Sequence, residues 1–382
     1  MARVLQVVTE LVVGGASLTM LDFAEDLAAE HDVQIAHGRL IGPENAALRR
    51  ARERFATYEL PQLGRPLSAR EDAAAIRDFH ALCRLVEPDV IHTHSSKAGF
   101  IGRIGAPHQT GRLFHTVHGW GHTPRDTRLR RSALVNAERL AARRTTKLIA
   151  VSPEVKAEGL ALGIGRAQQY AVIGAAVDMS PRAASFNVAC AEARLKLGIP
   201  RDVEVVGWVG RFSAQKDPWT LAEVVSRLLS ERPNAYAVLI GDGPDRGFVE
   251  KRLRPQIRAR RALMTGERAD ARSLYPAFDV LIHTTLWEGH PRVVREALAE
   301  RVPVVSARVS GTTEIAGDAR LGALVPAGEA QAFVAALSAI LGSRERSAPI
   351  DDAALAPLRA AAGEPYRLMR ELYRTSEQTC SN

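Results

Sequence analysis

The sequence predicts an α/β protein with two doubly wound domains, each a mostly parallel sheet with helices on both faces. Apolar strand patterns alternate with helical patterns along most of the chain, which is typical of parallel sheets. The 382 residues are more than one hydrophobic core usually spans. The alternation stops over 178–200 and then starts again. Two successive domains therefore fit the pattern better than one.

The first series of elements runs from the amino terminus to about residue 174. It opens with an apolar strand, and the helix after it follows a Gly-Gly turn. The expected strands are 3–10, 33–37, 89–94, 112–118, 147–152 and 169–174, and the clearest helices are 17–30, 70–87, KAGFIGRIGA and LVNAERLAARR. We place the first Rossmann-like domain at 1–180 and a linker at 181–200.

The second series repeats the same architecture with a different sequence. Its expected strands are 204–211, 235–243, 261–266, 279–285, 302–307 and 323–328. We place the second Rossmann-like domain at 201–350. The tail at 351–382 is largely helical, with interruptions at Pro357 and at Gly363–Pro365, and it can pack back on the first domain.

Composition restricts the classes of protein that remain open. Hydrophobic content is 46% and charged content 25%, which is ordinary for a globular domain. No run reaches 18 apolar residues, the amino-terminal apolar stretch is too short for a secretory signal, and three scattered cysteines make no disulfide framework. We therefore expect a cytoplasmic protein.

The chain is basic, with a net charge of +8 and an isoelectric point near 9.7. Part of this excess resembles coding bias, because arginine greatly outnumbers lysine. Two dense basic runs remain, at 125–147 and 251–261. They are interpreted either as solvated helix faces or as a surface for an acceptor or for the anionic inner face of a membrane. A nucleic-acid partner is not expected.

Candidate polar residues follow the carboxyl ends of the strands, where doubly wound sheets bind ligands. We expect the two domains to face a central cleft at these ends. Gly14 and Gly15 come between a strand and a helix, where glycine lets a ligand approach the backbone. A plain turn capped by Ser17 explains the same residues equally well.

One loop of the second domain carries two cations. Arg211 and Lys216 lie in GRFSAQKD, directly after a strand. A guanidinium fork and an ammonium together match a diphosphate. As leaving groups, nucleoside diphosphates gain negative charge, which such cations stabilise.

The segment LWEGHPRVVREALAE carries two carboxylates separated by a helix start. Pro291 fits the first turn of a helix, so Glu288 lies in the preceding loop and Glu296 inside the helix. The helix amino terminus between them favours an anion. This order suits a sugar, a diphosphate and a ribose.

Two other site classes are weakly supported. GDGP with Gly247 misses the spacing of a dinucleotide-binding loop by one residue. A metal cluster is a further alternative to polar residues at a cleft edge, and it would draw on His92, His94, His115, His118 and His122. Because no Asp-x-Asp pair exists to hold a divalent ion against a diphosphate, we expect no metal and no other cofactor.

Residues 204–316 resemble the retaining glycosyltransferases of family 4, which have the GT-B fold. The motifs that carry the resemblance are VGRFSAQKD, VLIGDGP and LWEGHPRVVREALAERVPVVSARVSGTTE, the last with its Glu-x7-Glu spacing. The amino-terminal half agrees more loosely, through the Gly-Gly loop, DVIHTHSSKAGFIGRIG and FHTVHGW. The resemblance thus implies a GT-B fold over nearly the whole chain.

The resemblance also implies roles for individual residues. Arg211 and Lys216 would bind the donor diphosphate, Glu296 the ribose hydroxyls, and His118 would face the transferred sugar. The catalytic set is His118, Arg211, Lys216 and Glu288, and the remaining substrate-binding residues are Gly14, Gly15, Gly289, His290, Pro291, Val293 and Glu296.

Four residues at three places depart from the family pattern: Ala175 and Ala176 in the turn before the linker, Arg301 where a glycine usually ends the helix, and Ser310 in place of the first glycine of a pair. None of them removes a named donor contact, and the first two places affect the hinge and the local loop geometry.

The expected function is a retaining transfer of a hexose-type sugar from a nucleoside-diphosphate sugar, foremost a UDP-sugar, to a hydroxylated acceptor. The product would be a glycan, a cell-surface polysaccharide or a glycosylated natural product. Two alternatives stay open, a nucleotide-sugar epimerase of the same fold and a non-catalytic nucleotide-binding partner protein.

Overall fold

The computed structural model describes residues 1–40, 44–64, 66–123, 125–180, 185–313, 318–342 and 349–378. The chain divides into two compact units. Unit 1 comprises Met1–Ala176 and Gly363–Asn382, and unit 2 comprises Val177–Ala362. The parallel-sheet architecture predicted for each half is confirmed.

The sheet of unit 1 has seven described strands, in the order β3-β2-β1-β4-β5-β6-β7. All neighbours are parallel. Central β1 is buried on both sides, with Val4 paired to Val33 of β2 and to Val90 of β4. The strands are β1 (Arg3–Val8), β2 (Asp32–Gly38), β3 (Ala56–Leu60), β4 (Val90–His94), β5 (Arg112–Val117), β6 (Lys147–Ala150) and β7 (Tyr170–Val172).

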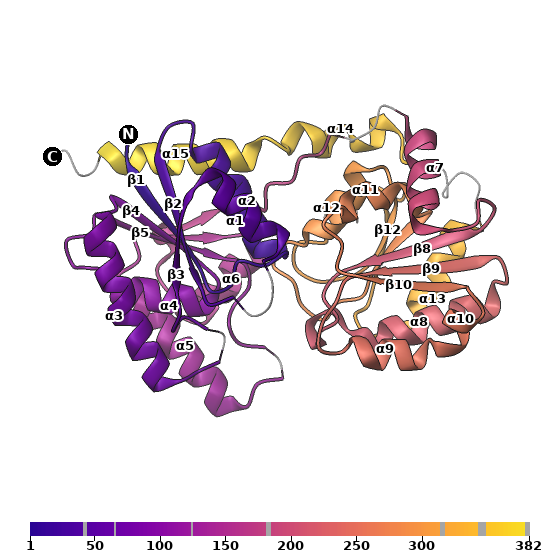
Figure 1. The fold of residues 1–382 in the computed structure, drawn as a ribbon, viewed down its shortest axis with the longest axis horizontal. Helices are drawn as coiled ribbons and strands as arrows, with labels where there is room; N and C mark the ends of the chain where they lie inside the picture. Colours follow the sequence, from indigo (N-terminus) through magenta and orange to yellow (C-terminus); the bar gives the residue numbers. More distant parts are fainter. Residues whose placement is uncertain are drawn as a thin grey trace. The chain divides into compact units, whose positions relative to one another are not determined.

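Helices cover both faces of this sheet (Figure 1). One face carries α1 (Gly15–Leu27), α2 (Ala46–Arg54) and α15 (Glu364–Gln378), and the other carries α3 (Ala69–Val86), α4 (Ser96–Gly105) and α5 (Arg128–Ala142). The short helices α6 (Pro153–Ala161) and η1 (Ala167–Gln169) follow.

Two glycines let α4 lie directly on the sheet. A Cβ atom at Gly99 would come 2.4 Å from the ring of His115, and one at Gly102 would come 2.5 Å from Thr93 Cγ2. Real Cβ atoms do not approach so closely. The glycines in KAGFIGRIGA therefore serve packing, and they bring the start of α4 close to the ends of β4 and β5.

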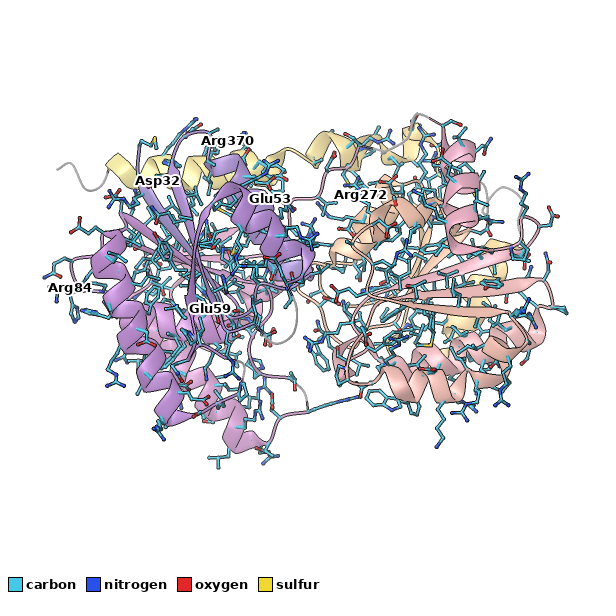
Figure 2. All side chains as sticks on the ribbon, viewed as in Figure 1. Asp32, Glu53, Glu59, Arg84, Arg272 and Arg370 are labelled. Carbon is cyan, nitrogen blue, oxygen red and sulfur yellow. The ribbon has the colours of Figure 1, made fainter. Side chains whose placement is uncertain are left out.

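The carboxyl-terminal tail divides between the units. Helix α14 (Asp352–Ala361) contributes Leu355 to the core of unit 2, whereas α15 contributes Met369 and Tyr373 to the core of unit 1. Arg370, labelled in Figure 2, donates to Asp26 of α1. The predicted tail is thus two elements that separate at Gly363, with Pro357 inside α14.

The predicted linker at 181–200 differs from the structure. Residues 181–184 lie outside the described part, and α7 (Phe186–Leu197) follows them as part of unit 2. Ala193 and Leu197 are buried in that unit's core. Gly198 ends the helix in the left-handed region at a φ of 64°, so this glycine inside the predicted linker is a helix stop.

The sheet of unit 2 has six described strands, in the order β10-β9-β8-β11-β12-β13, all parallel. The strands are β8 (Glu204–Val209), β9 (Ala235–Ile240), β10 (Ala262–Gly266), β11 (Val280–His283), β12 (Val304–Ala307) and β13 (Gly322–Val325). The strand order reverses between β8 and β11, because β9 and β10 lie on one side of β8 and β11 to β13 lie on the other. Ligands of doubly wound sheets bind at such a reversal.

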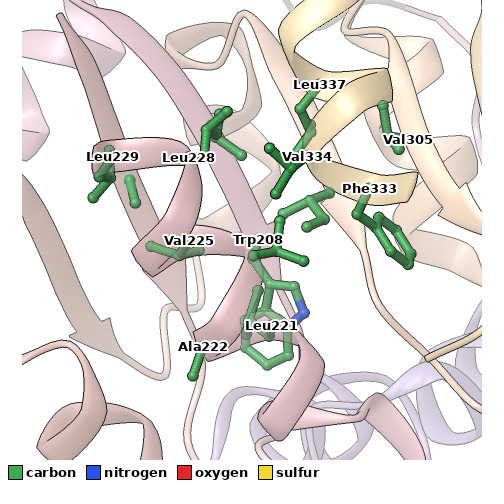
Figure 3. Packing of buried hydrophobic residues seen from close by; sticks show 14 of the residues in the cluster. Trp208, Leu221, Ala222, Val225, Leu228, Leu229, Val305, Phe333, Val334 and Leu337 are labelled. Carbon is green, nitrogen blue, oxygen red and sulfur yellow. The ribbon is translucent and has the colours of Figure 1, made fainter. Parts of the chain in front are cut away.

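Helices also cover both faces of the second sheet (Figure 1). One face carries α8 (Pro218–Glu231), α9 (Arg246–Arg252), α10 (Arg254–Arg258) and α13 (Ala330–Leu341), and the other carries α7, α11 (Ala271–Leu274), η3 (Tyr275–Ala277) and α12 (Arg292–Ala299). Trp208 lies among Leu221, Val225 and Val334 (Figure 3). Its ring stacks on that of Phe212, with the ring centroids 4.5 Å apart. This packing fixes both ends of the short segment that contains Arg211. Among the described helices, none is long and apolar enough to cross a bilayer.

Candidate functional site

Two loops of unit 2 meet at the carboxyl ends of the adjacent strands β8 and β11. Backbone and side-chain bonds hold them together: the Leu286 amide donates to the Gln215 carbonyl at 2.9 Å, and Gln215 Nε2 donates to the Trp287 carbonyl at 3.0 Å. Thr284 Oγ1 donates to the Lys216 carbonyl at 3.0 Å. The loop GRFSAQKD and the loop LWEGH, 72 residues further on, therefore form one surface.

Lys216 and Glu288 form an ion pair on that surface. Their side chains are only 17% and 10% exposed. Thr285 Oγ1 donates to Glu288 Oε1 at 3.2 Å, and His283 Nε2 lies 3.5 Å from the same oxygen. Burial raises the pKa of Glu288, but the charge of Lys216 and the contact with His283 outweigh it and bring the pKa to about 2. The carboxylate is therefore ionised at neutral pH.

His283 is buried behind Glu288. Its Nδ1 lies 2.8 Å from Ser306 Oγ of the neighbouring strand β12. Burial lowers the pKa of His283, with the Glu288 carboxylate opposing that effect. A neutral imidazole between a hydroxyl and a carboxylate supports the Glu288 side chain without cancelling its charge.

Glu296 lies on the second turn of α12. The Tyr275 hydroxyl donates to Glu296 Oε2 at 3.3 Å, and Arg292 Nε lies 3.4 Å from Oε1. Burial, and then the Glu296 carboxylate, raise the pKa of Tyr275 well above its usual value, so the hydroxyl remains a donor. The Glu296 side chain is 15% exposed, which argues against a freely solvated helix face.

Pro291 lies one position earlier than predicted. It precedes α12 as the residue before the first helical one, with φ −73° and ψ 112°, rather than lying in the first turn. The helix therefore begins at Arg292, and the two glutamates lie on opposite sides of that start, as the spacing predicts. Val293 is half-buried in the first turn.

The backbone of Gly289 and His290 packs against the turn after β12. Gly311 has a φ of 72°, and a Cβ atom there would lie 2.6 Å from the Gly289 carbonyl oxygen and 2.7 Å from His290 Cα. Position 311 therefore requires glycine. Ser310 replaces only the other glycine of the usual pair, and Glu314 of the same motif lies outside the described residues.

Local contacts also stabilise Arg301, which stands where the family usually has a glycine. It has a φ of 63°, a left-handed conformation that costs a non-glycine residue about 1 kcal/mol. Its Nη2 donates to Asp352 at 2.8 Å, and its carbonyl accepts from the Ile350 amide at 3.0 Å. These contacts with the start of α14 compensate for the missing glycine.

Arg211 differs from Lys216 in its surroundings. It is exposed, and no described residue pairs with its guanidinium. The neighbouring glycines of GDGP are explained by close packing of backbones: a Cβ atom at Gly241 would lie 1.8 Å from the Gly210 carbonyl oxygen, and one at Gly243 would lie 2.4 Å from that of Phe212. The motif therefore fixes the Arg211 loop, which removes the reason for a dinucleotide site.

In unit 1, Gly14 and Gly15 open α1, with Gly14 as the residue before the helix. Gly14 is extended, at a φ of −176°, and a Cβ atom there would meet nothing within 4 Å. No contact with a described residue therefore explains this glycine. Ser17 is not the cap, because its hydroxyl donates to the Glu10 carbonyl at 2.9 Å.

Four of the five candidate metal-binding histidines make hydrogen bonds within unit 1, whereas His122 Nε2 lies 3.7 Å from Glu158 Oε1. His92 Nε2 lies 2.7 Å from Thr116 Oγ1, and His115 Nδ1 lies 2.9 Å from Thr93 Oγ1. His94 lies 3.0 Å from His118, which is half-buried just beyond β5. No group of described residues has the arrangement of a metal centre.

The structure brings Lys216, Glu288 and the backbone of 289–291 together in unit 2, with Glu296 one turn into α12. His118, Gly14 and Gly15 belong to unit 1. The sequence analysis missed the supporting residues His283, Thr285, Tyr275 and Arg292. A usable signal existed for two of them, because HTT directly after the apolar run VLI places polar side chains at a buried strand end.

Two parallel doubly wound units, with cations and carboxylates at the strand ends of the second, define the class of GT-B glycosyltransferases. The model described as Glycosyltransferase Family 4 matches residues 13–180, and that described as Glycosyl transferases group 1 matches 203–343. These stretches together make up more than half of the chain. The protein belongs to glycosyltransferase family 4, as its motifs indicate.

Individual proteins agree with this assignment. An Escherichia coli UDP-Gal:alpha-D-GlcNAc-diphosphoundecaprenol alpha-1,3-galactosyltransferase is 27% identical over 284 residues, 73% of each chain. The Rhizobium meliloti lipopolysaccharide core biosynthesis glycosyltransferase LpsE is 34% identical over 148 residues, 39% of this chain and 42% of that one. The structure of Anabaena HepE in complex with UDP and glucose superposes with a TM-score of 0.77 at 21% identity over 100% of both chains. That likeness confirms the GT-B fold.

Proposed function

We propose that this glycosyltransferase moves a hexose-type sugar from a UDP-sugar to a hydroxyl group, with retention of the anomeric configuration. The observation that carries the proposal is the buried ion pair of Lys216 and Glu288, together with the exposed Arg211 of the same loop, whose guanidinium pairs with no described residue. A cation and a carboxylate held side by side match the two halves of the donor, its diphosphate and its sugar hydroxyls.

The two cations act on the leaving group in this proposal. Arg211 and Lys216 bind the diphosphate and stabilise its charge as the bond to the sugar breaks. Lys216 carries three N–H donors, so it can bind a phosphate oxygen while one donor stays on Glu288. The donor therefore adds to the ion pair and does not have to break it.

The carboxylates bind hydroxyl groups. Glu288 accepts from the transferred sugar, with its position fixed by Thr285 and supported by His283. Glu296 accepts from the ribose, and the N–H groups of Gly289, His290 and Arg292 approach the diphosphate at the start of α12, where Pro291 has no N–H to donate. Tyr275 and Arg292 hold the Glu296 carboxylate in position.

The reaction proceeds on one face of the sugar. The bond from the anomeric carbon to the diphosphate oxygen breaks, and the sugar passes through an oxocarbenium-like state. The acceptor oxygen then bonds to the anomeric carbon on that same face, and its proton goes to the departing phosphate oxygen. The products are the glycoside and UDP, and neither a covalent intermediate on the protein nor a metal ion is required.

Two similar proteins support UDP as the nucleotide, because the Escherichia coli relative is a UDP-Gal enzyme and HepE was solved with UDP and glucose. The acceptor in this proposal is hydroxylated and belongs to a glycan, a lipid-linked precursor or a natural product. Unit 1 provides its binding residues, with Gly14 and Gly15 next to it. We also propose peripheral contact with an anionic membrane through α5.

The test combines donor binding with turnover. Thermal shift with UDP-, GDP- and dTDP-sugars should select UDP, since a ligand at 100 times its dissociation constant stabilises by about 2.7 kcal/mol. NMR of the product anomeric proton should then show retention. Conversion of the donor to an epimer without acceptor would replace the proposal by an epimerase, and donor binding without any turnover would replace it by a nucleotide-binding partner protein.

A further inference from the structure

A chain of buried polar side chains connects the carboxyl-terminal helix to His118 within unit 1. Gln6 Nε2 donates to the Tyr373 hydroxyl at 3.3 Å, and Gln6 Oε1 lies 2.8 Å from His94 Nε2. His94 Nδ1 lies 3.0 Å from His118 Nε2. Gln6, His94 and Tyr373 have no exposed surface, so their only partners are one another and the surrounding protein.

The orientation of Gln6 determines where each proton lies. An amide oxygen only accepts, so His94 Nε2 is the donor to Gln6. Burial, and then the neighbouring histidines, lower the pKa of His94 well below its usual value, so the ring is neutral and its Nδ1 has no proton. His118 Nε2 must then be the donor to His94. In neutral His118 the other nitrogen, Nδ1, is consequently an acceptor.

A second series of hydrogen bonds leads from Tyr373 through His92 to Thr116, and its proton positions agree with those of the first. Because the Tyr373 oxygen accepts from Gln6, its own proton is available to His92 Nδ1, 2.8 Å away. His92 is buried, which lowers its pKa to about 3, and as a neutral ring it then donates from Nε2 to Thr116. A single arrangement of protons therefore satisfies both series.

Tyr373 is fixed at the end of this chain by several contacts. Arg112 Nη1 donates to the Tyr373 carbonyl at 2.8 Å, and the Tyr373 ring packs edge-on against Phe114 at 5.1 Å. Arg370 pairs with Asp26 of α1, and Arg374 of the same helix pairs with Glu30 in the turn after α1. A helix near the end of the chain thus holds a hydroxyl inside the first sheet, where an apolar side chain would satisfy packing alone.

We propose that Gln6, His94 and Tyr373 are positioning residues that set the tautomer and ring orientation of His118, so that His118 Nδ1 accepts a hydrogen bond from a hydroxyl of the transferred sugar. The proposal rests on the proposed function in one respect, the contact between His118 and the sugar. The hydrogen-bonded series from Tyr373 through Gln6 and His94 to His118, which we call the relay, is a property of unit 1 and can be measured without donor or acceptor.

The first test is spectroscopic. Side-chain 15N–1H correlation of histidine-labelled protein should show neutral His94 and His118, each with its proton on Nε2, the His118 signal being assigned by its loss in His118→Gln. In Tyr373→Phe, which keeps the ring packing, and in Gln6→Met, which keeps the shape, the His118 signals should move toward the other tautomer. Protonation of His118 at Nδ1 in the wild type, or unchanged signals in both variants, would overturn the relay.

The second test separates positioning from stability. Tyr373→Phe and Gln6→Met should lower kcat by about tenfold while the affinity for UDP, measured by calorimetry, stays unchanged. Thr93→Val is the matched control: it removes an equally buried hydroxyl, bonded to His115 in the same sheet, without a link to His118, and its kcat should equal the wild type. An equal loss of kcat in Thr93→Val would mean that losing any buried hydroxyl of this sheet lowers kcat through general destabilisation, and it would overturn the inference.

The two tests distinguish the relay from the proposed function. If the wild type shows the expected tautomers but transfers no sugar, the relay stands and the transferase function fails. If the wild type transfers sugar and Tyr373→Phe changes neither the tautomer nor kcat, the function stands and the relay fails.

Discussion

Lys216 and Glu288 are 72 residues apart in the chain and in direct contact in the fold. The contact forms because β8 and β11 are neighbours in the sheet, with Leu281 beside Gly207. Both side chains are largely buried, so each charge depends on the other. Removing one partner of a buried pair leaves an uncompensated charge, which typically costs about 3–5 kcal/mol.

The two cations should therefore respond differently to substitution. Arg211→Ala and Lys216→Ala should each lower turnover by about 10²–10³. Arg211 is exposed, so its loss should leave the melting temperature unchanged. Lys216→Ala should also destabilise the fold, and Lys216→Ala combined with Glu288→Gln should recover stability but not turnover. Thermal melts beside initial rates measure this, and near-normal rates in both single variants would remove the diphosphate assignment.

The pKa of Glu288 predicts an acid-dependent loss of stability. Folding lowers this pKa from 4.5 to about 2, so the unfolded chain takes up the proton first as the pH falls. The stabilisation is complete above pH 4.5 and is lost between about pH 4.5 and pH 2. Glu288→Gln should show a shallower fall in the free energy of unfolding over this window, measured by urea titration. Identical slopes would mean that the ion pair does not hold the proton off Glu288.

Most of the fold could be predicted from the sequence, because parallel strands buried on both faces form apolar runs that stand out, as in VLI of β11. The helix α2 and the strand β3 were missed. ATYEL of β3 is an edge strand with exposed and half-buried residues, so it lacks that apolar signal. The linker was misplaced because a glycine that ends a helix, as Gly198 does, also occurs where linkers begin.

The candidate site could be predicted in part. Short-range patterns place Glu288 before α12 and Glu296 within it. The Lys216–Glu288 contact depends on which strands are neighbours, and the relay to His118 depends on Tyr373, which joins β1 and β4 only in the folded chain. Sequence spacing contains neither relationship, since both arise from tertiary packing.

Metal independence is a further prediction. Activity should persist in excess EDTA, because the cations of Arg211 and Lys216 supply the charge that a divalent ion would supply next to a diphosphate. Initial rates with and without chelator measure this. Full loss of activity, restored by Mg²⁺ or Mn²⁺, would refute the metal-free mechanism. Restoration by Zn²⁺ alone would support a zinc site formed by the histidines of unit 1.

The amino-terminal end of α5 should bind anionic membranes. Leu129 is 83% exposed, and Arg128 and Arg131 beside it are exposed in a first turn that has no acidic residue. Sedimentation with phosphatidylglycerol vesicles should fade with salt and should be lost in the Arg128→Glu and Arg131→Glu double variant. Arg258→Glu, in the other basic run, is the control. No sedimentation of the wild type at low salt would favour an acceptor away from membranes.

The two glutamates should fail in different ways if they bind different parts of the donor. Glu296→Gln keeps the shape but removes a charged acceptor, and hydrogen bonds to charged groups contribute about 1.5–3 kcal/mol. This variant should bind both the donor and UDP more weakly. Glu288→Gln should leave UDP affinity nearly intact, because UDP has no sugar, and should instead lower kcat.

Calorimetry with UDP on both variants decides whether Glu288 and Glu296 bind different parts of the donor or act alike. The residues that contact each glutamate provide further variants. Tyr275→Phe removes the hydroxyl that orients Glu296, so it should reproduce part of the Glu296→Gln loss of UDP affinity without changing the charge. Thr285→Val should in the same way reproduce part of the Glu288→Gln loss in kcat. Equal UDP affinities for Glu288→Gln and Glu296→Gln would contradict separate roles, because a ligand without a sugar would then fail to distinguish the loop carboxylate from the helix carboxylate.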